Sequence, residues 1–138
     1  MRGTDGDVLY LDFDGVLHHE NCFWHPRRGA YLLAPPEYKL FPHAGLLELL
    51  LAPYPHLAIV LSTSWVRRYR YSKTANRLLP SLRARVIGAT FHSRMNERDF
   101  AELPRGRQVL ADVLRRKPAR WLALDDDAAD WPEDSLLI

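Results

Sequence analysis

Residues 8–19 read VLYLDFDGVLHH, an apolar run that ends abruptly in carboxylates and a glycine. The first four residues have the composition of a buried strand, and Asp12, Asp14 and Gly15 follow almost at once. A solvated turn uses the same residue types. A calcium loop would place Glu at its twelfth position, but counting from Asp12 that position is Phe23. The rest of the chain therefore has to decide what the two carboxylates do.

The composition is that of an ordinary globular domain. The chain has 138 residues, of which 47% are hydrophobic and 26% charged, and its formal net charge is +2. We interpret residues 1–138 as a single domain without a general preference for polyanions or membranes. Cys22 is the only cysteine, which excludes an internal disulfide. No apolar run is long enough to span a bilayer, and we expect a cytoplasmic protein with no membrane association.

Short apolar runs recur along the chain, and continuous runs of this length are typical of strands buried on both faces of a parallel sheet. Four of them cover residues 7–11, 56–61, 84–89 and 120–124, and a fifth covers 135–138. Candidate helices lie at 43–52, 64–79 and 106–117, and each is followed by a proline. This alternation predicts an α/β fold with three layers and a five-stranded, mainly parallel sheet.

Residues 18–42 interrupt the alternation of strands and helices. They contain several prolines and Gly29, with aromatic residues between them. This composition predicts an irregular flap or a hairpin directly after the first strand. The segment is too short to form a separate folded cap domain.

Polar residues follow three of the predicted strands. They are Asp12 and Asp14 after the first, Ser62, Thr63 and Ser64 after the second, and Asp125, Asp126 and Asp127 after the fourth. Each group alone fits a turn or a helix cap. Together they would meet at the carboxyl edge of the sheet, where parallel α/β domains bind ligands. Gathered carboxylates repel one another unless a cation lies among them, and oxygen ligands favour Mg²⁺.

This arrangement of groups favours phosphoryl transfer to water. A carboxylate beside Mg²⁺ can attack phosphorus and form an aspartyl-phosphate. A second carboxylate two residues along can protonate the leaving oxygen and then activate the hydrolytic water. A hydroxyl and a basic side chain would hold the phosphoryl oxygens as charge develops on them.

The same stretches resemble the motifs of the haloacid dehalogenase (HAD) superfamily. YLDFDGVLH resembles its first motif, IVLSTS its second and LALDDD its fourth, in the same order across nearly the whole chain. More narrowly, these stretches together with RGRQVLADVL are similar to the small HAD-type domains associated with RNA-repair proteins. The resemblance implies a Mg²⁺-dependent phosphatase on a Rossmann-like sheet. No sizeable cap is expected, because residues 18–42 supply only a flap.

The resemblance also implies roles for the carboxylates. Asp12 would be the nucleophile, and Asp14 the general acid and base. Mg²⁺ would be held by Asp12, by the backbone carbonyl of Asp14, and by Asp125 or Asp126.

For the phosphate, the resemblance implies one hydroxyl and one cation. Thr63 is the expected hydroxyl and Ser62 the alternative, because the end of the strand is uncertain by one residue. The third motif of the superfamily is a lysine just before the last helix. Here the sequence is LPRGRQVL, so Arg105 is expected in that role, with Arg107 as the alternative.

The middle of the chain is strongly basic, while its two ends carry most of the acids. WVRRYRY, residues 65–71, places aromatic residues among arginines, a composition that can bind phosphates and stack on bases. A solvated helix face with arginines packed over aromatics is the alternative. The candidate substrate contacts are His18, Trp65, Arg67, Arg68 and Arg70.

The expected function is therefore a phosphatase for phosphorylated nucleic-acid ends or another large substrate, since no lid encloses a small metabolite. Two alternatives stay open: a non-catalytic module that recognises phosphate, and a metal-dependent nuclease that forms no covalent intermediate. A receiver-type phosphoacceptor domain would need an acceptor acid after a middle strand, and ARVIGATF, residues 84–91, has none.

Overall fold

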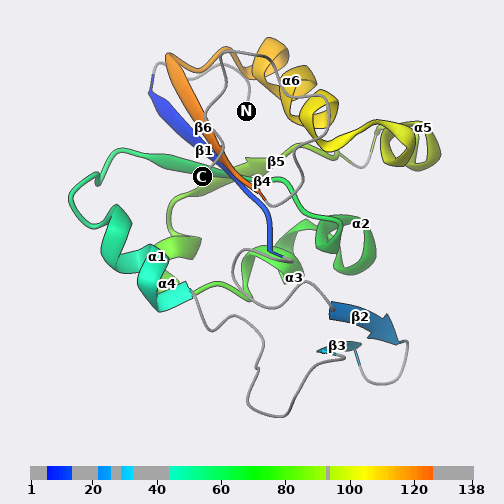
Figure 1. Ribbon diagram of the computed structural model, residues 1–138, viewed down its shortest axis with the longest axis horizontal. Coiled ribbons are helices and arrows are strands. Elements are labelled where there is room, and N and C mark those ends of the chain that lie inside the picture. Colours follow the sequence, from blue (N-terminus) through cyan, green and yellow to red (C-terminus); the bar gives the residue numbers. More distant parts are fainter. Residues whose placement is uncertain (1–5, 14–21, 26–28, 33–43, 93, 126–138) are drawn as a thin grey trace.

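The computed structural model describes residues 6–13, 22–25, 29–32, 44–92 and 94–125. These residues build a four-stranded, all-parallel sheet with the strand order β5-β4-β1-β6 (Figure 1). The strands are β1 (Asp7–Leu11), β4 (Ala58–Leu61), β5 (Val86–Ala89) and β6 (Arg120–Leu124). The predicted α/β fold with a parallel sheet is confirmed. The fifth strand, predicted at 135–138, lies outside the described residues.

The central strand explains why the opening stretch is apolar throughout. β1 pairs with β4 on one side and with β6 on the other. Val8, Leu9, Tyr10 and Leu11 are each at most 3% exposed. A strand that is covered on both faces needs apolar side chains on both, so its sequence shows a continuous run and no alternation.

Two further strands, β2 (Cys22–His25) and β3 (Gly29–Leu32), form an antiparallel pair of their own. They lie within the segment for which a flap or a hairpin is predicted, and the described part of it is a hairpin. The other residues of 18–42 lie outside the described part of the chain.

The described helices are α1 (Ala44–Leu51), α2 (Trp65–Tyr69), α3 (Tyr71–Ala75), α4 (Pro80–Arg83), α5 (Glu97–Glu102) and α6 (Arg105–Arg116). α1 and α6 match two of the predicted helices within a residue or two at each end. The prediction of one helix over 64–79 is wrong, because α2 and α3 divide that segment. Pro80, predicted to stop a helix, instead begins α4, where its missing N–H costs nothing.

The division between α2 and α3 lies at Arg70, whose backbone has φ 71° and ψ 165°. Residues other than glycine rarely adopt this conformation. The Arg70 carbonyl accepts the Thr74 N–H at 3.1 Å and lies 2.7 Å from the Thr74 hydroxyl. That hydroxyl is also 3.0 Å from the Trp65 carbonyl. The buried Thr74 hydroxyl thus lies between the carbonyl of Trp65, the first residue of α2, and that of Arg70, which separates α2 from α3, and it supports the break.

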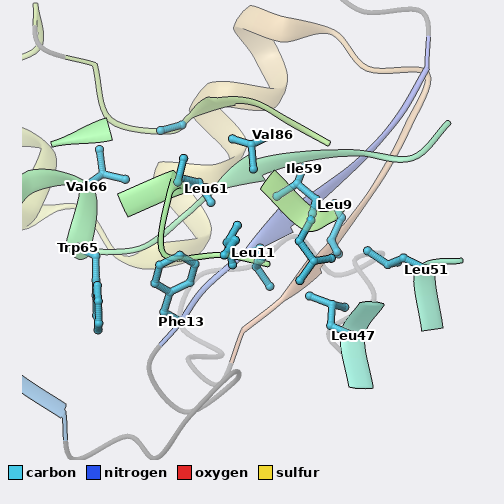
Figure 2. Packing of buried hydrophobic residues seen from close by; sticks show 14 residues of the cluster. Leu9, Leu11, Phe13, Leu47, Leu51, Ile59, Leu61, Trp65, Val66 and Val86 are labelled. Carbon is cyan, nitrogen blue, oxygen red and sulfur yellow. The ribbon is translucent and has the colours of Figure 1, made fainter. Parts of the chain in front are cut away.

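Helices cover both faces of the sheet, which confirms the three predicted layers. Figure 2 shows the larger core, where residues of α1 to α4 pack on one face against Leu9, Leu11, Ile59 and Leu61. On the other face, Val109 of α6 packs against Val8, Tyr10, Val60 and Ala123. Alternate residues of each strand thus serve opposite faces. In the part of the chain that the structure describes, no helix is both long and apolar enough to cross a membrane.

Candidate active site

Three polar residues meet at the carboxyl edge of the sheet, each directly after one of three neighbouring strands. Asp12 follows β1, Ser62 follows β4 and Asp125 follows β6. The backbone ladder extends to this level: the Ser62 N–H donates to the Leu11 carbonyl at 2.8 Å, and the Asp12 N–H donates to the Leu124 carbonyl at 3.1 Å. The structure therefore brings together the first residue of each predicted polar group.

The face on which these side chains lie follows from the alternation along each strand. Tyr10, Val60 and Ala123 belong to the core under α6. Asp12, Ser62 and Asp125 each come two residues later and continue on that face. Leu61 belongs to the opposite core, so Thr63, two residues after it, starts on the opposite side. The three residues of the site therefore face the helix that carries Arg105.

Arg105, the first residue of α6, joins the three strand ends. Its Nη1 atom lies 3.2 Å from Oδ1 of Asp12 and 2.9 Å from Oδ2 of Asp125. The same atom donates to the Ser62 carbonyl at 2.6 Å. Arg107, the alternative considered from the sequence, is exposed on the same helix. The contacts with Asp12 and Asp125, the described carboxylates of the site, are made by Arg105.

Burial sets the charge state of this group. Desolvation raises the pKa of Asp12 to about 8, the guanidinium of Arg105 opposes that rise, and repulsion from Asp125 adds to it. Desolvation lowers the pKa of Arg105, but its two carboxylate partners raise it by more, so the cation stays charged. One half-buried cation thus faces two buried carboxyl groups. When both carboxyls are ionised, the described site has an excess of one negative charge.

The described residues fit a magnesium site in the chemistry of their donors. Asp12 and Asp125 offer the carboxylate oxygens that a hard dication prefers, and their excess negative charge is what a dication offsets. Within the described ranges, no three His, Cys, Asp or Glu side chains gather in one place. Asp14 and Asp126, the other predicted ligands, lie outside those ranges.

Ser62 and Thr63 differ sharply in their surroundings. Both are buried, at 1% and 7% exposure. The Thr63 Oγ1 accepts the backbone N–H of Trp65 at 3.3 Å, at the start of α2. The Ser62 Oγ has no hydrogen-bond partner among the described residues. Ser62, the alternative to Thr63 as the phosphate-binding hydroxyl, is therefore the residue whose hydroxyl still needs a partner.

The predicted substrate contacts are not all on the surface. Trp65 is only 3% exposed, and its ring packs edge-on against Phe13, with 5.4 Å between centroids. The expectation that Trp65 offers a face to a base is wrong, because this ring is part of the core. Arg67 is half-buried and Arg70 is exposed. His18 and the side chain of Arg68 lie outside the description.

A second buried polar cluster, which the sequence analysis missed, lies further along α6. Asp112 is 1% exposed and accepts hydrogen bonds from the Tyr10 hydroxyl at 2.7 Å and from Nε of Arg116 at 2.8 Å. The sequence does contain a signal for this cluster. Asp112 comes three residues after the buried Val109, on the face of an amphipathic helix that apolar residues should occupy. A carboxylate in that position requires buried partners.

Comparison with known protein families agrees with this architecture and with the motifs. No curated protein and no solved structure matches the chain. One family model does match, over residues 8–137, and its description is the HAD domain in Swiss Army Knife RNA repair proteins. The match covers β1 except Asp7, continues through β6 and includes every residue of the candidate site. With the parallel sheet and the acids at its carboxyl edge, this places the chain in the family of HAD domains of Swiss Army Knife RNA repair proteins.

Proposed function

We propose that this protein is a Mg²⁺-dependent phosphatase that works through an aspartyl-phosphate on Asp12. The observation that carries the proposal is the contact of one Arg105 nitrogen with Asp12, Asp125 and the Ser62 carbonyl. This contact holds a buried carboxylate beside a cation at the edge where α/β domains bind ligands. Family membership points in the same direction, since it suggests a phosphohydrolase.

In the proposed reaction, a carboxylate oxygen of Asp12 attacks the phosphorus of the substrate, and the bond between phosphorus and the leaving oxygen breaks. Asp14 gives that oxygen its proton. Water then attacks the phosphorus of the aspartyl-phosphate while Asp14 takes the water's proton. Inorganic phosphate leaves and the Asp12 carboxylate is restored. The role of Asp14 comes from the sequence motif, because this residue lies outside the described part of the chain.

Asp12 and Asp125 are the described residues that would hold Mg²⁺, with the carbonyl of Asp14 and the carboxylate of Asp126 as further ligands expected from the sequence. The bound ion would offset the charge of the carboxylates and of the phosphoryl oxygens. A nearby dication lowers the pKa of a carboxyl group, which opposes the effect of burial on Asp12. Asp12 would then be ionised, as its role as nucleophile requires.

We assign phosphate binding to Ser62 and Arg105. The Ser62 Oγ is buried, and no described residue satisfies it. Buried polar atoms seldom stay unpaired, so a phosphoryl oxygen is a suitable partner for this hydroxyl. Arg105 uses Nη1 for the protein contacts, and Nε and Nη2 of its planar guanidinium are the donors that we assign to phosphate.

Removing the two neighbouring hydroxyls one at a time shows which of them binds phosphate and which stabilises the fold. Ser62→Ala is expected to lower kcat/KM for an aryl phosphate by about 10- to 100-fold, because a hydrogen bond to a charged group contributes about 1.5–3 kcal/mol. Thr63→Ala removes the partner of the Trp65 N–H. It should cost about 1 kcal/mol of stability and change kcat/KM by less than about threefold. Steady-state kinetics and urea unfolding of both variants check this, and the reverse pattern would assign the phosphate to Thr63.

As substrate class we propose phosphorylated ends of nucleic acid. The family is one of RNA repair proteins. α2 begins three residues after Ser62, and Arg67, Arg70 and Lys73 follow on α2, at its end and on α3. Arg70 and Lys73 are exposed. Cations next to the site in the chain would attract the phosphates that flank a terminal phosphate.

The function is tested by phosphate release from an aryl phosphate and from oligonucleotides that carry a 3′ or a 5′ phosphate. We expect release only with Mg²⁺ or a similar dication, and loss of activity in excess chelator. Full activity in chelator would contradict the metal assignment. Tight binding of phosphorylated ends without release would favour a recognition module, and cleavage of internal bonds would favour a nuclease.

The substrate class is tested by neutralising the cations that follow the site. Arg67→Gln with Arg70→Gln is expected to raise KM for a phosphorylated oligonucleotide about tenfold at low salt. The slope of log KM against log salt should fall by about 1–2, with aryl phosphate turnover unchanged.

The matched control also removes two positive charges, but beyond the far end of α6. Lys117 and Arg120 are both exposed there, and Lys117→Gln with Arg120→Gln should change neither substrate's kinetics. Equal losses on both substrates in the first double variant would show that its arginines serve the fold. A free nucleotide that outcompetes every oligonucleotide would contradict the nucleic-acid assignment.

A further inference from the structure

The buried cluster around Asp112 links α6 to two strands of the sheet. Asp112 accepts hydrogen bonds from the Tyr10 hydroxyl of β1 and from two nitrogens of Arg116, Nε at 2.8 Å and Nη2 at 3.2 Å. Nη2 of Arg115 lies 3.2 Å from Asp112 Oδ1 and 3.3 Å from the carbonyl of Thr90, just beyond β5. A single carboxylate thus connects the helix with the middle and one side of the sheet.

Arg116, which belongs to the Asp112 cluster, also lies close against the backbone of β5. The guanidinium of Arg116 lies over Gly88, where a Cβ would come within 2.9 Å of Nη2. Arg116 is 3% exposed, so its charge is balanced inside the protein by Asp112. Directional hydrogen bonds of this kind fix one relative position of two elements, whereas apolar side chains tolerate sliding.

The Asp112 cluster and the candidate site share the same two elements. Tyr10 precedes Asp12 by two residues, so both side chains lie on the α6 face of β1. Asp112 follows Arg105 by seven residues, which is about two turns, so both lie on one side of α6. β1 and α6 are therefore joined twice, through Asp12 with Arg105 and through Tyr10 with Asp112.

We propose that the hydrogen bond between Tyr10 and Asp112 is a positioning contact, which holds α6 so that Arg105 meets Asp12 and Asp125. This inference rests on the proposed function, for which it names a residue pair that supports the site from within the fold. The Tyr10 hydroxyl donates to Oδ2 of Asp112 at 2.7 Å, and both residues are buried. Tyr10 and Asp112 act through Arg105 and do not touch the substrate.

Tyr10→Phe removes this hydrogen bond and keeps the ring, which packs edge-on against Trp121 at 5.8 Å between centroids. We expect kcat for an aryl phosphate to fall about tenfold, since small displacements of a charged group at a reaction centre are costly. In an Arg105→Ala background, the same substitution should change kcat by less than about twofold, because the group that it positions is gone. Equal losses in both backgrounds, or no loss in the first, would overturn the inference.

A second readout does not depend on activity. The side-chain Nε–H signal of Arg105, assigned by its absence in Arg105→Ala, is recorded by ¹⁵N NMR. Tyr10→Phe should shift or broaden it. Ile59→Val, which destabilises the opposite core, should leave it unchanged. An unchanged Arg105 signal in Tyr10→Phe would overturn the inference.

The two readouts also separate this inference from the proposed function. If the wild-type protein releases no phosphate under any condition, the proposed function fails, and the NMR comparison alone still decides whether Tyr10 positions Arg105. Asp112→Asn serves as a second variant if Tyr10→Phe does not fold, and the same shift of the Arg105 signal is expected from it.

Discussion

The Asp12→Asn variant is expected to lose Mg²⁺-dependent phosphatase activity by about 10⁴-fold or more, because an amide cannot attack phosphorus as a carboxylate does. The substitution keeps the size of a residue that is only 3% exposed, so the packing at the end of β1 is preserved. Rapid quenching of the wild type with a labelled substrate should trap phosphate on the protein, and quenching of the variant should trap none. Turnover within tenfold of wild type would contradict the assignment of Asp12 as nucleophile.

The stability of this variant, measured as a function of pH, shows whether it folds and whether burial raises the pKa of Asp12. Burial raises the pKa of Asp12 from 3.8 to about 8, so the folded state binds this proton more tightly than the unfolded state. In chelator, the stability that this group contributes is full below pH 3.8 and is lost as the pH rises towards 8. Asp12→Asn lacks the titrating group. Urea unfolding between pH 5 and 9 should therefore show the variant gaining stability relative to wild type as pH increases. Parallel curves would contradict the raised pKa.

The second large effect is expected at Arg105. Arg105→Ala leaves two buried carboxyl groups without their common cation. Turnover should fall by about 10²- to 10³-fold, as when one charge-stabilising group is removed from a reaction centre. Breaking a buried ion pair from one side costs about 3–5 kcal/mol, and a saturating dication should restore part of this loss. Kinetics and urea unfolding with and without Mg²⁺ measure both effects.

Two controls separate the charge of Arg105 from its shape. Arg105→Lys keeps a positive charge that can contact the strand ends but lacks Nε and Nη2, the donors assigned to phosphate, so its turnover is expected to fall, though by less than that of Arg105→Ala. Arg107→Ala removes an exposed arginine from the same turn of α6 and should change turnover by less than about twofold. Full activity in Arg105→Ala would contradict the assignment of Arg105 to the site. A loss in Arg107→Ala as large as that in Arg105→Ala would contradict it as well.

Much of this architecture could be predicted from the sequence, because its signals are local. A strand covered on both faces must be apolar throughout, so DVLYL and RWLAL mark β1 and β6 at their observed bounds. The carboxyl ends of parallel strands meet at one edge, so the residues that end these runs predict that Asp12, Ser62 and Asp125 lie together. Arg105 was expected there because the resemblance to the HAD superfamily implies a cation just before the last helix. In each case a short segment carries the whole signal.

The tertiary structure decided the features that depend on which side of an element faces which neighbour. Ser62 and Thr63 are adjacent in the sequence and both carry a hydroxyl. The structure distinguishes them because they continue on opposite faces of β4: Ser62 lies beside Arg105, and Thr63 binds the backbone N–H of Trp65. Trp65 resembles a surface aromatic among arginines, yet it packs in the core against Phe13, because it lies on the side of α2 that faces the sheet. Asp112 finds its partner Tyr10 more than a hundred residues away. Pairings between distant segments exist only once the chain has folded, because neither residue carries a local sign of the other.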